Sequence, residues 1–191
     1  MAQMPLNGEI RITSKYGYRT DPITGASKSW HGGLDLVSNN RAVLASVSGV
    51  VAVSQIVTDK NNPTWEWGNY VRLETADGYA VYLCHLASVS VRAGQTVSAG
   101  DVLGVEGSTG KSTGSHCHLE VRKGGKSTDP TLYLDIANRV GSYPVTAATS
   151  KNTDFSTLVC ERAGLEAQTK AYLNQYKYAE DLWRKLWEAM S

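Results

Sequence analysis

Glycine and proline are distributed very unevenly along this chain, and their distribution limits its possible folds more than any other feature. Of 191 residues, 17 of the 18 glycines and all five prolines precede residue 145. They punctuate short alternating runs about every eight to twelve positions, which is typical of an antiparallel all-β domain. No strand–helix–strand rhythm is present, which argues against a parallel nucleotide-binding sheet. We therefore predict a β-rich domain over residues 8–140.

Several strands can be assigned within this domain. Asp77–Gly78 is a dipeptide typical of two-residue hairpins, and it predicts that residues 69–75 pair with residues 79–86. Further strands are expected at residues 49–57, 89–91, near 97, 101–106 and 116–122. The fold class is therefore mostly β, with an antiparallel sheet.

The last part of the chain has a different composition. Residues 141–153 are rich in Ser, Thr and Ala and predict a linker, and residues 154–191 predict an α-helical appendage. A stripe at helical spacing runs along it: Tyr172, Tyr176, Ala179, Trp183, Leu186 and Met190. The stripe leaves three interpretations open: packing onto the β domain, self-association, or docking to a larger assembly.

Charge, apolar runs and cysteines exclude several classes of protein. The 19 basic and 18 acidic side chains are scattered, so a nucleic-acid partner is not expected. The longest apolar stretch, residues 42–57, is interrupted by polar residues, so no membrane span is expected, and the chain as given begins with no signal peptide. The odd cysteine count, with Cys84, Cys117 and Cys160, predicts reduced thiols rather than a disulfide framework.

The chain has four histidines, each within a predicted strand or where a strand meets a turn: His31, His85, His116 and His118. Residues two apart in a strand point to the same face, so His116 and His118 are expected to face together, with Cys117 turned to the core. By the same alternation Asp35 is expected to be exposed between its buried leucine neighbours. An aspartate in that position requires a functional explanation.

Metal ligation is one such explanation. Zinc takes imidazole nitrogen and carboxylate oxygen, and a hydrolytic zinc site keeps three protein ligands with one position open. His31, Asp35 and one of the paired histidines would complete that set. The remaining histidines could then serve as general base and as hydrogen-bond donor to the transition state, because imidazole titrates near neutral pH.

A series of motifs extends this pattern in order along the chain: residues 12–19, 21–25, 31–35, 68–71, 82–86, 94–97, 107–110, 115–122 and 129–134. Together they resemble the lysostaphin and LytM-type zinc endopeptidases, which cut peptide bonds in bacterial peptidoglycan. The resemblance covers roughly residues 10–135. It implies an antiparallel peptidase domain with a groove across its sheet.

The resemblance also implies residue roles. His31 and Asp35 of the H-x-x-x-D motif and His118 of the H-x-H motif would hold Zn²⁺, and His85 and His116 would be catalytic, without a choice of which is the general base. Cys84 and Cys117 depart from the family pattern, and strand parity predicts that both point away from the site.

The function expected from the resemblance is hydrolysis of a peptidoglycan peptide, in the cross-bridge or the stem. The enzyme would act in the cell wall, as a phage lysin, a virion-associated protein, or a secreted extracellular or periplasmic hydrolase. Trp65 and Trp67 would either line the groove or only cover the core, and Trp183 and Trp187 of the tail could meet cell-wall sugars.

Two other functions remain open. A non-catalytic scaffold or activator could keep the same fold without hydrolysing anything. A swivelling carrier module is the second, because residues 94–104 resemble the hairpin of biotinyl and lipoyl domains. No lysine stands at a hairpin tip in the setting that a carrier needs.

Overall fold

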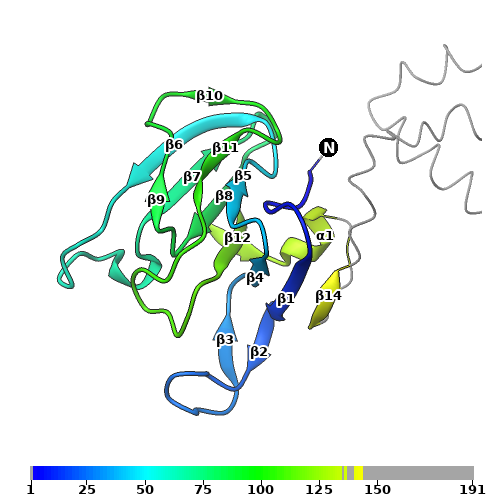
Figure 1. The fold of residues 1–191 in the computed structure, drawn as a ribbon, viewed down its shortest axis with the longest axis vertical. Coiled ribbons are helices and arrows are strands. Elements are labelled where there is room, and N and C mark those ends of the chain that lie inside the picture. Colours follow the sequence, from blue (N-terminus) through cyan, green and yellow to red (C-terminus); the bar gives the residue numbers. More distant parts are fainter. Residues whose placement is uncertain (1, 135, 137–139, 144–191) are drawn as a thin grey trace, which may run out of the picture. The chain divides into compact units, whose positions relative to one another are not determined.

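One large antiparallel sheet carries most of the fold. The computed structural model describes residues 2–134, 136 and 140–143. In these residues a nine-stranded sheet has the order β10-β6-β7-β8-β12-β4-β1-β14, with β13 paired to β12 (Figure 1). Its strands are β1 (Ile10–Ser14), β4 (Leu34–Ser38), β6 (Gly49–Gln55), β7 (Tyr70–Glu74), β8 (Tyr79–Cys84), β10 (Thr96–Val97), β12 (Cys117–Lys123), β13 (Lys126–Thr128) and β14 (Gly141–Tyr143).

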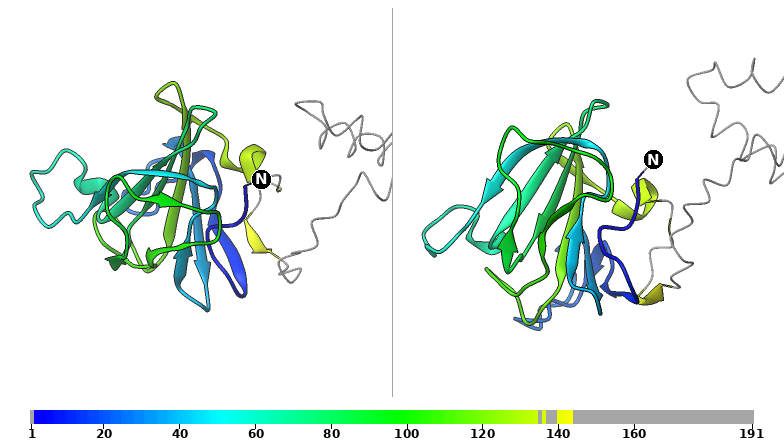
Figure 2. Two further views of the ribbon diagram at one scale, coloured as in Figure 1. Left: turned by 90° about the horizontal axis from the view of Figure 1, so that it is seen from above. Right: turned by 45° about the horizontal axis from the view of Figure 1, so that its top comes forward.

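Smaller elements complete the fold. A three-stranded sheet consists of β5 (Ala42–Leu44), β11 (Val102–Val105) and β9 (Ser88–Val89), and β2 (Gly17–Arg19) pairs with β3 (Ser29–His31). The β2–β3 pair projects from one end of the large sheet (Figure 1). Helical structure within the described residues is limited to η1 (Trp65–Trp67) and α1 (Pro130–Leu134). The segment between β6 and β7, which contains η1, extends away from the sheet (Figure 2).

The mostly β, antiparallel prediction is confirmed. Strands β7 and β8 form the expected hairpin around Asp77–Gly78, with Glu74 opposite Ala80. The structure adds β1, β2, β3 and β5 near the N-terminus, most of them too short to show alternation in the sequence. It also places β14 against β1, so the sheet continues three residues beyond position 140. The rest of the expected linker 141–153 and the expected helical tail 154–191 lie outside the described residues.

Alternation along the central strands separates a core face from a second face. Leu119 and Val121 of β12 and Val81 and Leu83 of β8 are fully buried in the main hydrophobic cluster. Removing such side chains from water supplies about 1.5–3 kcal/mol each, so the register of these strands is strongly determined. The intervening residues of the same strands therefore occupy the opposite face, where the polar side chains gather.

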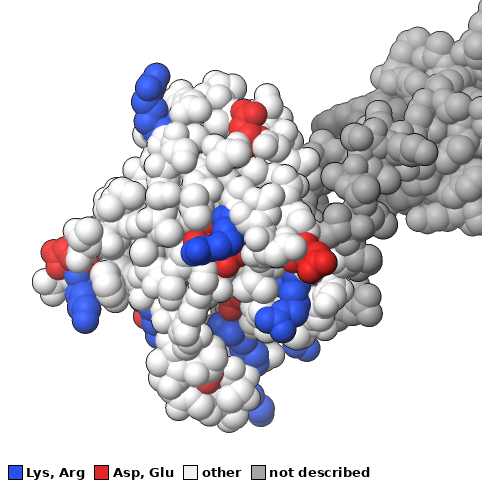
Figure 3. Space-filling view, in the orientation of Figure 1, with Lys and Arg blue, Asp and Glu red and all other residues white. Residues whose placement is uncertain are grey.

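Both signs of charge are dispersed over the face shown in Figure 3, without a patch of a single sign. This agrees with the scattered charges of the sequence. None of the described helices is long and apolar enough to cross a membrane.

Candidate metal centre

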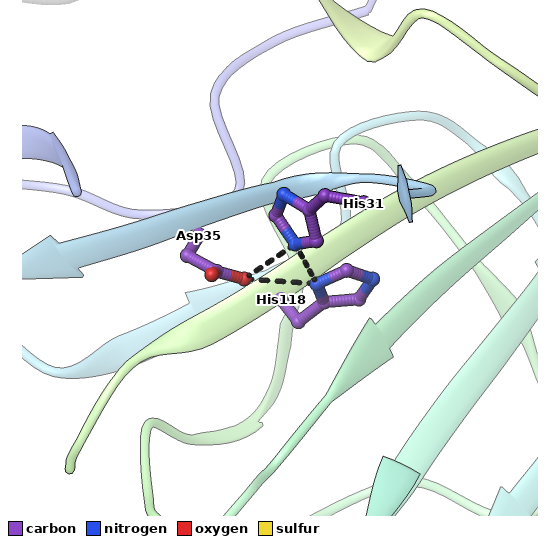
Figure 4. A group of neighbouring side chains, drawn as sticks. All are labelled: His31, Asp35 and His118. Carbon is purple, nitrogen blue, oxygen red and sulfur yellow. Dashed lines mark hydrogen bonds and ion pairs between the residues drawn. The ribbon is translucent and has the colours of Figure 1, made fainter. Parts of the chain in front are cut away.

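Three side chains from two sheet strands and a neighbouring hairpin converge at one point (Figure 4). His118 of β12 lies directly opposite Asp35 of β4, and His31 ends β3. Asp35 Oδ1 is 3.1 Å from His31 Nε2 and 2.9 Å from His118 Nδ1, and the two imidazole nitrogens are 3.1 Å apart. We call these three residues the metal corner.

The donor atoms of the metal corner fit a zinc ion. Ligand atoms about 2.0–2.1 Å from a tetrahedral zinc ion lie about 3.3 Å from one another, close to the separations found here. His31 Nδ1 is 2.8 Å from the Lys15 carbonyl oxygen, which can only accept, so Nδ1 carries the proton and Nε2 presents its lone pair. Lone pairs that converge on one point need a proton or a cation between them. The site therefore has the chemistry of a cation site with nitrogen and oxygen ligands.

Gly33 makes the close approach of His118 possible. A Cβ on Gly33 would lie 2.7 Å from the His118 ring and 2.4 Å from the Leu119 carbonyl oxygen. Both separations are well inside van der Waals contact, so no other residue fits this position without displacing the metal corner. The glycine within the H-x-x-x-D motif thus has a packing function that the sequence did not reveal.

Asp35 faces the groove as expected, but it is not exposed. Its side chain is covered by the two imidazoles and by Arg19, whose Nη1 is 3.4 Å from Asp35 Oδ2, and only 8% of the residue is accessible. Burial alone would raise the pKa of the Asp35 carboxyl, but hydrogen bonds with His118 and His31 hold it well below its ordinary value. Asp35 is therefore a buried carboxylate whose charge is compensated locally.

The remaining two histidines lie beside the metal corner and line the same pocket. His116 Nε2 is 3.6 Å from Asp35 Oδ1, and the ring centroids of His85 and His116 are 4.7 Å apart. We call His85 and His116 the loop corner, because both lie just outside strands. All five residues selected from the sequence thus meet in one groove.

Backbone carbonyls hold the loop corner. His85 Nδ1 is 2.8 Å from the Thr109 carbonyl oxygen, and His116 Nδ1 is 2.8 Å from that of Gly114. Both Nδ1 atoms are consequently protonated, and each ring keeps Nε2 as the free nitrogen. His85 has φ of 64°, a conformation that is rare for a residue other than glycine and is concentrated at functional sites.

Two loops meet tightly around His85. The His85 amide donates to the Trp67 carbonyl oxygen over 2.8 Å, so η1 holds its backbone. A Cβ on Gly68 would lie 2.4 Å from Thr109, which shows how closely the loop after η1 packs against the loop that contacts the His85 ring. Both tryptophans pack against the aromatic cluster beside the groove, and Trp67 also lines the groove. Trp67 therefore fulfils both interpretations, as a groove residue and as a cover of the cluster, whereas Trp65 fulfils only the second.

The two corners have opposite electrostatics in the metal-free protein. Burial would lower the pKa of His118, but Asp35 and Glu120 raise it to about 9. Burial lowers the pKa of His85 to about 4, and the neighbouring His116 and His118 contribute to that decrease. His85 is therefore neutral over the physiological range, as a proton acceptor must be.

One of the two cysteines lies on the side opposite to that expected. Cys117 is buried in the main core, as strand parity predicted. Cys84, however, is directly opposite His118 in the β8–β12 register and belongs to the aromatic cluster on the groove face. It is fully buried, and burial raises the pKa of its thiol well above the ordinary value, so it remains a protonated thiol.

Sequence reasoning missed three charged residues of the site. Glu120 and Arg122 follow His118 on the same face of β12, and Arg19 contacts Asp35. The period-two alternation from His118 could have identified the first two. Nothing in the sequence brings Arg19 to Asp35, because that contact depends on the β2–β3 hairpin.

The described residues thus form an antiparallel sheet that carries a His–Asp–His cluster, the donor set of a metal site, in an open groove. Comparison with known proteins agrees, because the model of peptidase family M23 matches residues 29–130. The chain belongs to peptidase family M23, and the lysostaphin-type resemblance seen in the sequence is confirmed.

Two curated relatives show the range of the family. The DD-carboxypeptidase/endopeptidase Mpg of Neisseria meningitidis is 35% identical over 123 residues, covering 63% of this chain and 26% of the relative. The murein hydrolase activator NlpD of Escherichia coli is 32% identical over 111 residues, covering 58% of this chain and 27% of the relative. The chain thus spans about a quarter of the length of the curated relatives it matches.

A solved structure supports the fold. The catalytic domain of a variant of the prophage-encoded M23 protein EnpA from Enterococcus faecalis has a TM-score of 0.57 and 29% sequence identity to this chain. The match covers 69% of this chain and 96% of that domain. The β domain therefore shares the fold of nearly the whole of that domain.

Proposed function

We propose that this chain is a zinc-dependent endopeptidase that hydrolyses peptide bonds in bacterial peptidoglycan. The observation that carries the proposal is the convergence of His31 Nε2, Asp35 Oδ1 and His118 Nδ1 to within 3.1 Å of one another, in a groove that also contains two further imidazoles. The name of the Neisseria relative, a DD-carboxypeptidase/endopeptidase, supports the reaction class. We propose that it acts in the cell wall, as a phage-derived or secreted hydrolase.

The metal corner would hold the zinc. When bound there, zinc supplies a Lewis acid that polarises a carbonyl group and acidifies water. Asp35 contributes the negative charge of the ligand set, and Arg19 holds its outer oxygen at 3.4 Å. The Lys15 carbonyl fixes the ring of His31 through the hydrogen bond to Nδ1.

The loop corner would move the protons. Each of its rings is held through Nδ1 by a backbone carbonyl, so Nε2 is the atom available to the substrate. A neutral His85 can accept a proton from the attacking water at Nε2. His116, whose Nε2 is 3.6 Å from Asp35 Oδ1, can donate a hydrogen bond from that nitrogen to the developing oxyanion when its ring is doubly protonated. The reverse assignment requires a protonated His85, which its lowered pKa disfavours. Separate His85 and His116 variants distinguish the two.

Digestion of purified peptidoglycans of several cross-link types tests the proposal. Incubation with and without a chelator, with the fragments identified by mass spectrometry, should give new amino termini only in the presence of metal. Fragments from a single cross-link type would also identify the bond. An intact polymer after incubation with zinc-loaded protein would contradict the proposal.

The similarity to NlpD favours one alternative, a non-catalytic activator of cell-wall hydrolysis. An activator would release no fragments alone, but would increase the release caused by a separate peptidoglycan hydrolase. The presence of all five side chains in the groove is the observation against it.

A further inference from the structure

The ring of His118 has a second nitrogen, and it faces a buried carboxylate. Nδ1 points to the metal corner, while Nε2 lies 3.6 Å from Glu120 Oε2, an ion-pair distance. Glu120 is two residues further along β12, and therefore on the same face of the strand. Only 5% of Glu120 is accessible, so this carboxylate has little water to compensate its charge.

Arg122 holds the other oxygen of Glu120. Its Nε donates to Glu120 Oε1 over 2.6 Å, which leaves Oε2 for His118. The guanidinium in turn lies over two aromatic rings, 5.2 Å from the centroid of Trp67 and 4.8 Å from that of Tyr82. Such cation–π contacts restrict a long side chain to one orientation. An unbroken series of contacts thus leads from the aromatic rings to the imidazole.

The partner of His118 differs in kind from those of the other two ligands. A neutral backbone carbonyl holds His31, and a cation holds the outer oxygen of Asp35. Among the three, His118 alone has an anion behind it. A carboxylate that accepts from the outer nitrogen of a ligating imidazole fixes its tautomer and increases its basicity.

From these contacts we propose that Glu120 is a positioning residue, which orients His118 and strengthens it as a metal ligand, and that Arg122 holds Glu120 in place. The proposal rests on the proposed function only in taking the metal to be zinc. Glu120 acts through His118 and has no proton to transfer to the substrate. Its loss should therefore be measurable as weaker metal binding in the absence of any substrate.

The β7 strand offers a matched control. Arg72 and Glu74 are also two residues apart and are joined by an ion pair of 2.8 Å, but the Glu74 side chain is 57% exposed. No imidazole ion pair involves Glu74 among the described contacts. Glu74→Gln removes the same charge from the same kind of pair without touching the metal corner.

The test measures Zn²⁺ affinity of the full chain by competition with a chromogenic chelator, for the wild type, Glu120→Gln, Arg122→Met and Glu74→Gln. Glu120→Gln should bind Zn²⁺ about 10-fold to 100-fold more weakly, and Arg122→Met should show a smaller loss. Glu74→Gln should equal the wild type. With Co²⁺ in place of zinc, the visible absorption bands of Glu120→Gln should shift, whereas a merely structural role would leave them unchanged.

Circular dichroism of the metal-free variants verifies the fold, and Arg122→Met, altered at a partly exposed position, provides the answer if Glu120→Gln is unfolded. Unchanged Zn²⁺ affinity in a folded Glu120→Gln, or equal losses in Glu74→Gln, would overturn the proposal. If the wild type binds Zn²⁺ but cleaves no peptidoglycan, the proposed function fails and the role of Glu120 stands. If the wild type binds no Zn²⁺, both fail.

Discussion

The metal corner and the loop corner use the same type of side chain in opposite ways. The rings of His118 and His85 have centroids only 5.9 Å apart, His85 is buried, and the His118 side chain is only 11% exposed. Nearby carboxylates raise the pKa of His118 to about 9, although burial alone would lower it. Burial lowers the pKa of His85 to about 4. The difference teaches that the role of an imidazole is decided by its partners, and not by its depth in the protein.

The supports of the two corners differ as well. Two of the three metal-corner ligands belong to paired strands of the large sheet, and His31 closes the set from the neighbouring hairpin. The loop corner depends on backbone carbonyls of a loop, those of Thr109 and Gly114. Substitutions should therefore separate metal binding from proton transfer.

The largest effect is expected from His118→Ala. It removes one of three metal ligands, so stoichiometric zinc binding should be abolished, and hydrolysis with it. Metal analysis of the purified protein after dialysis, beside a turnover assay, measures both. A His118→Ala protein that keeps its zinc and its activity would contradict the assignment of metal binding to the metal corner.

His116→Ala and His85→Ala should have the converse effect. Both variants keep all three ligands, so zinc content should equal that of the wild type, whereas turnover should fall about 10²-fold to 10⁴-fold with the loss of a proton-transfer group. The same dialysis and turnover measurements apply. Loss of zinc from either variant would show that the loop corner contributes to metal binding.

Gly33→Ala should have a smaller effect, on packing. Its Cβ would lie 2.7 Å from the His118 ring, and such overpacking typically costs about 1–3 kcal/mol of unfolding free energy. Gly32→Ala is the matched control, because its Cβ would meet only the Glu120 carboxylate at 3.4 Å. Denaturant unfolding of the metal-free proteins measures both, and equal stability of the two variants would contradict the packing argument.

The smallest effect concerns the pH dependence of stability without metal. The pKa of His118 is raised to about 9 in the folded protein. Protonated His118 therefore contributes fully to the free energy of unfolding below its unfolded pKa near 6.5, and this contribution is lost as the pH rises through 9. The pKa of His85 is lowered to about 4. Neutral His85 therefore contributes fully to the free energy of unfolding above pH 6.5, and this contribution is lost as the pH falls through 4.

Thermal unfolding between pH 4 and pH 10 measures this dependence. His118→Gln should flatten the alkaline side of the profile, and His85→Gln the acidic side. A profile in which His118→Gln changes only the acidic side would reverse the assignment of the two electrostatic environments.

Local patterns predicted much of this molecule. The Asp77–Gly78 hairpin and the antiparallel sheet follow from short-range spacing, and the meeting of all five site residues follows from the resemblance to the lysostaphin-type endopeptidases. The burial of Asp35 could not be predicted, because Arg19 and two distant imidazoles cover it. Alternation shows which residues of one strand share a face of the sheet. It does not show which residues of the neighbouring strand lie opposite them.

Cys84 illustrates that limit. Its parity within β8 is plain from the sequence, but its side relative to His118 depends on the pairing of β8 with β12. Glu120 shows the reverse situation, because its position two residues after His118 was sufficient to place it on the groove face. Relationships within one strand are therefore predictable, and those between strands need the structure.

The alternation of β12 ties folding and chemistry to a single alignment. A slip of this strand by one residue would carry the imidazole and the carboxylate of His118 and Glu120 into the hydrocarbon interior, and would turn Cys117 and Leu119 outward. A protein with β12 in the wrong register would consequently lose both its core packing and its metal-ligating His118 side chain. A stably folded protein with a misassembled metal centre is therefore not expected, because burial of the apolar residues of β12 requires the same register as the metal centre.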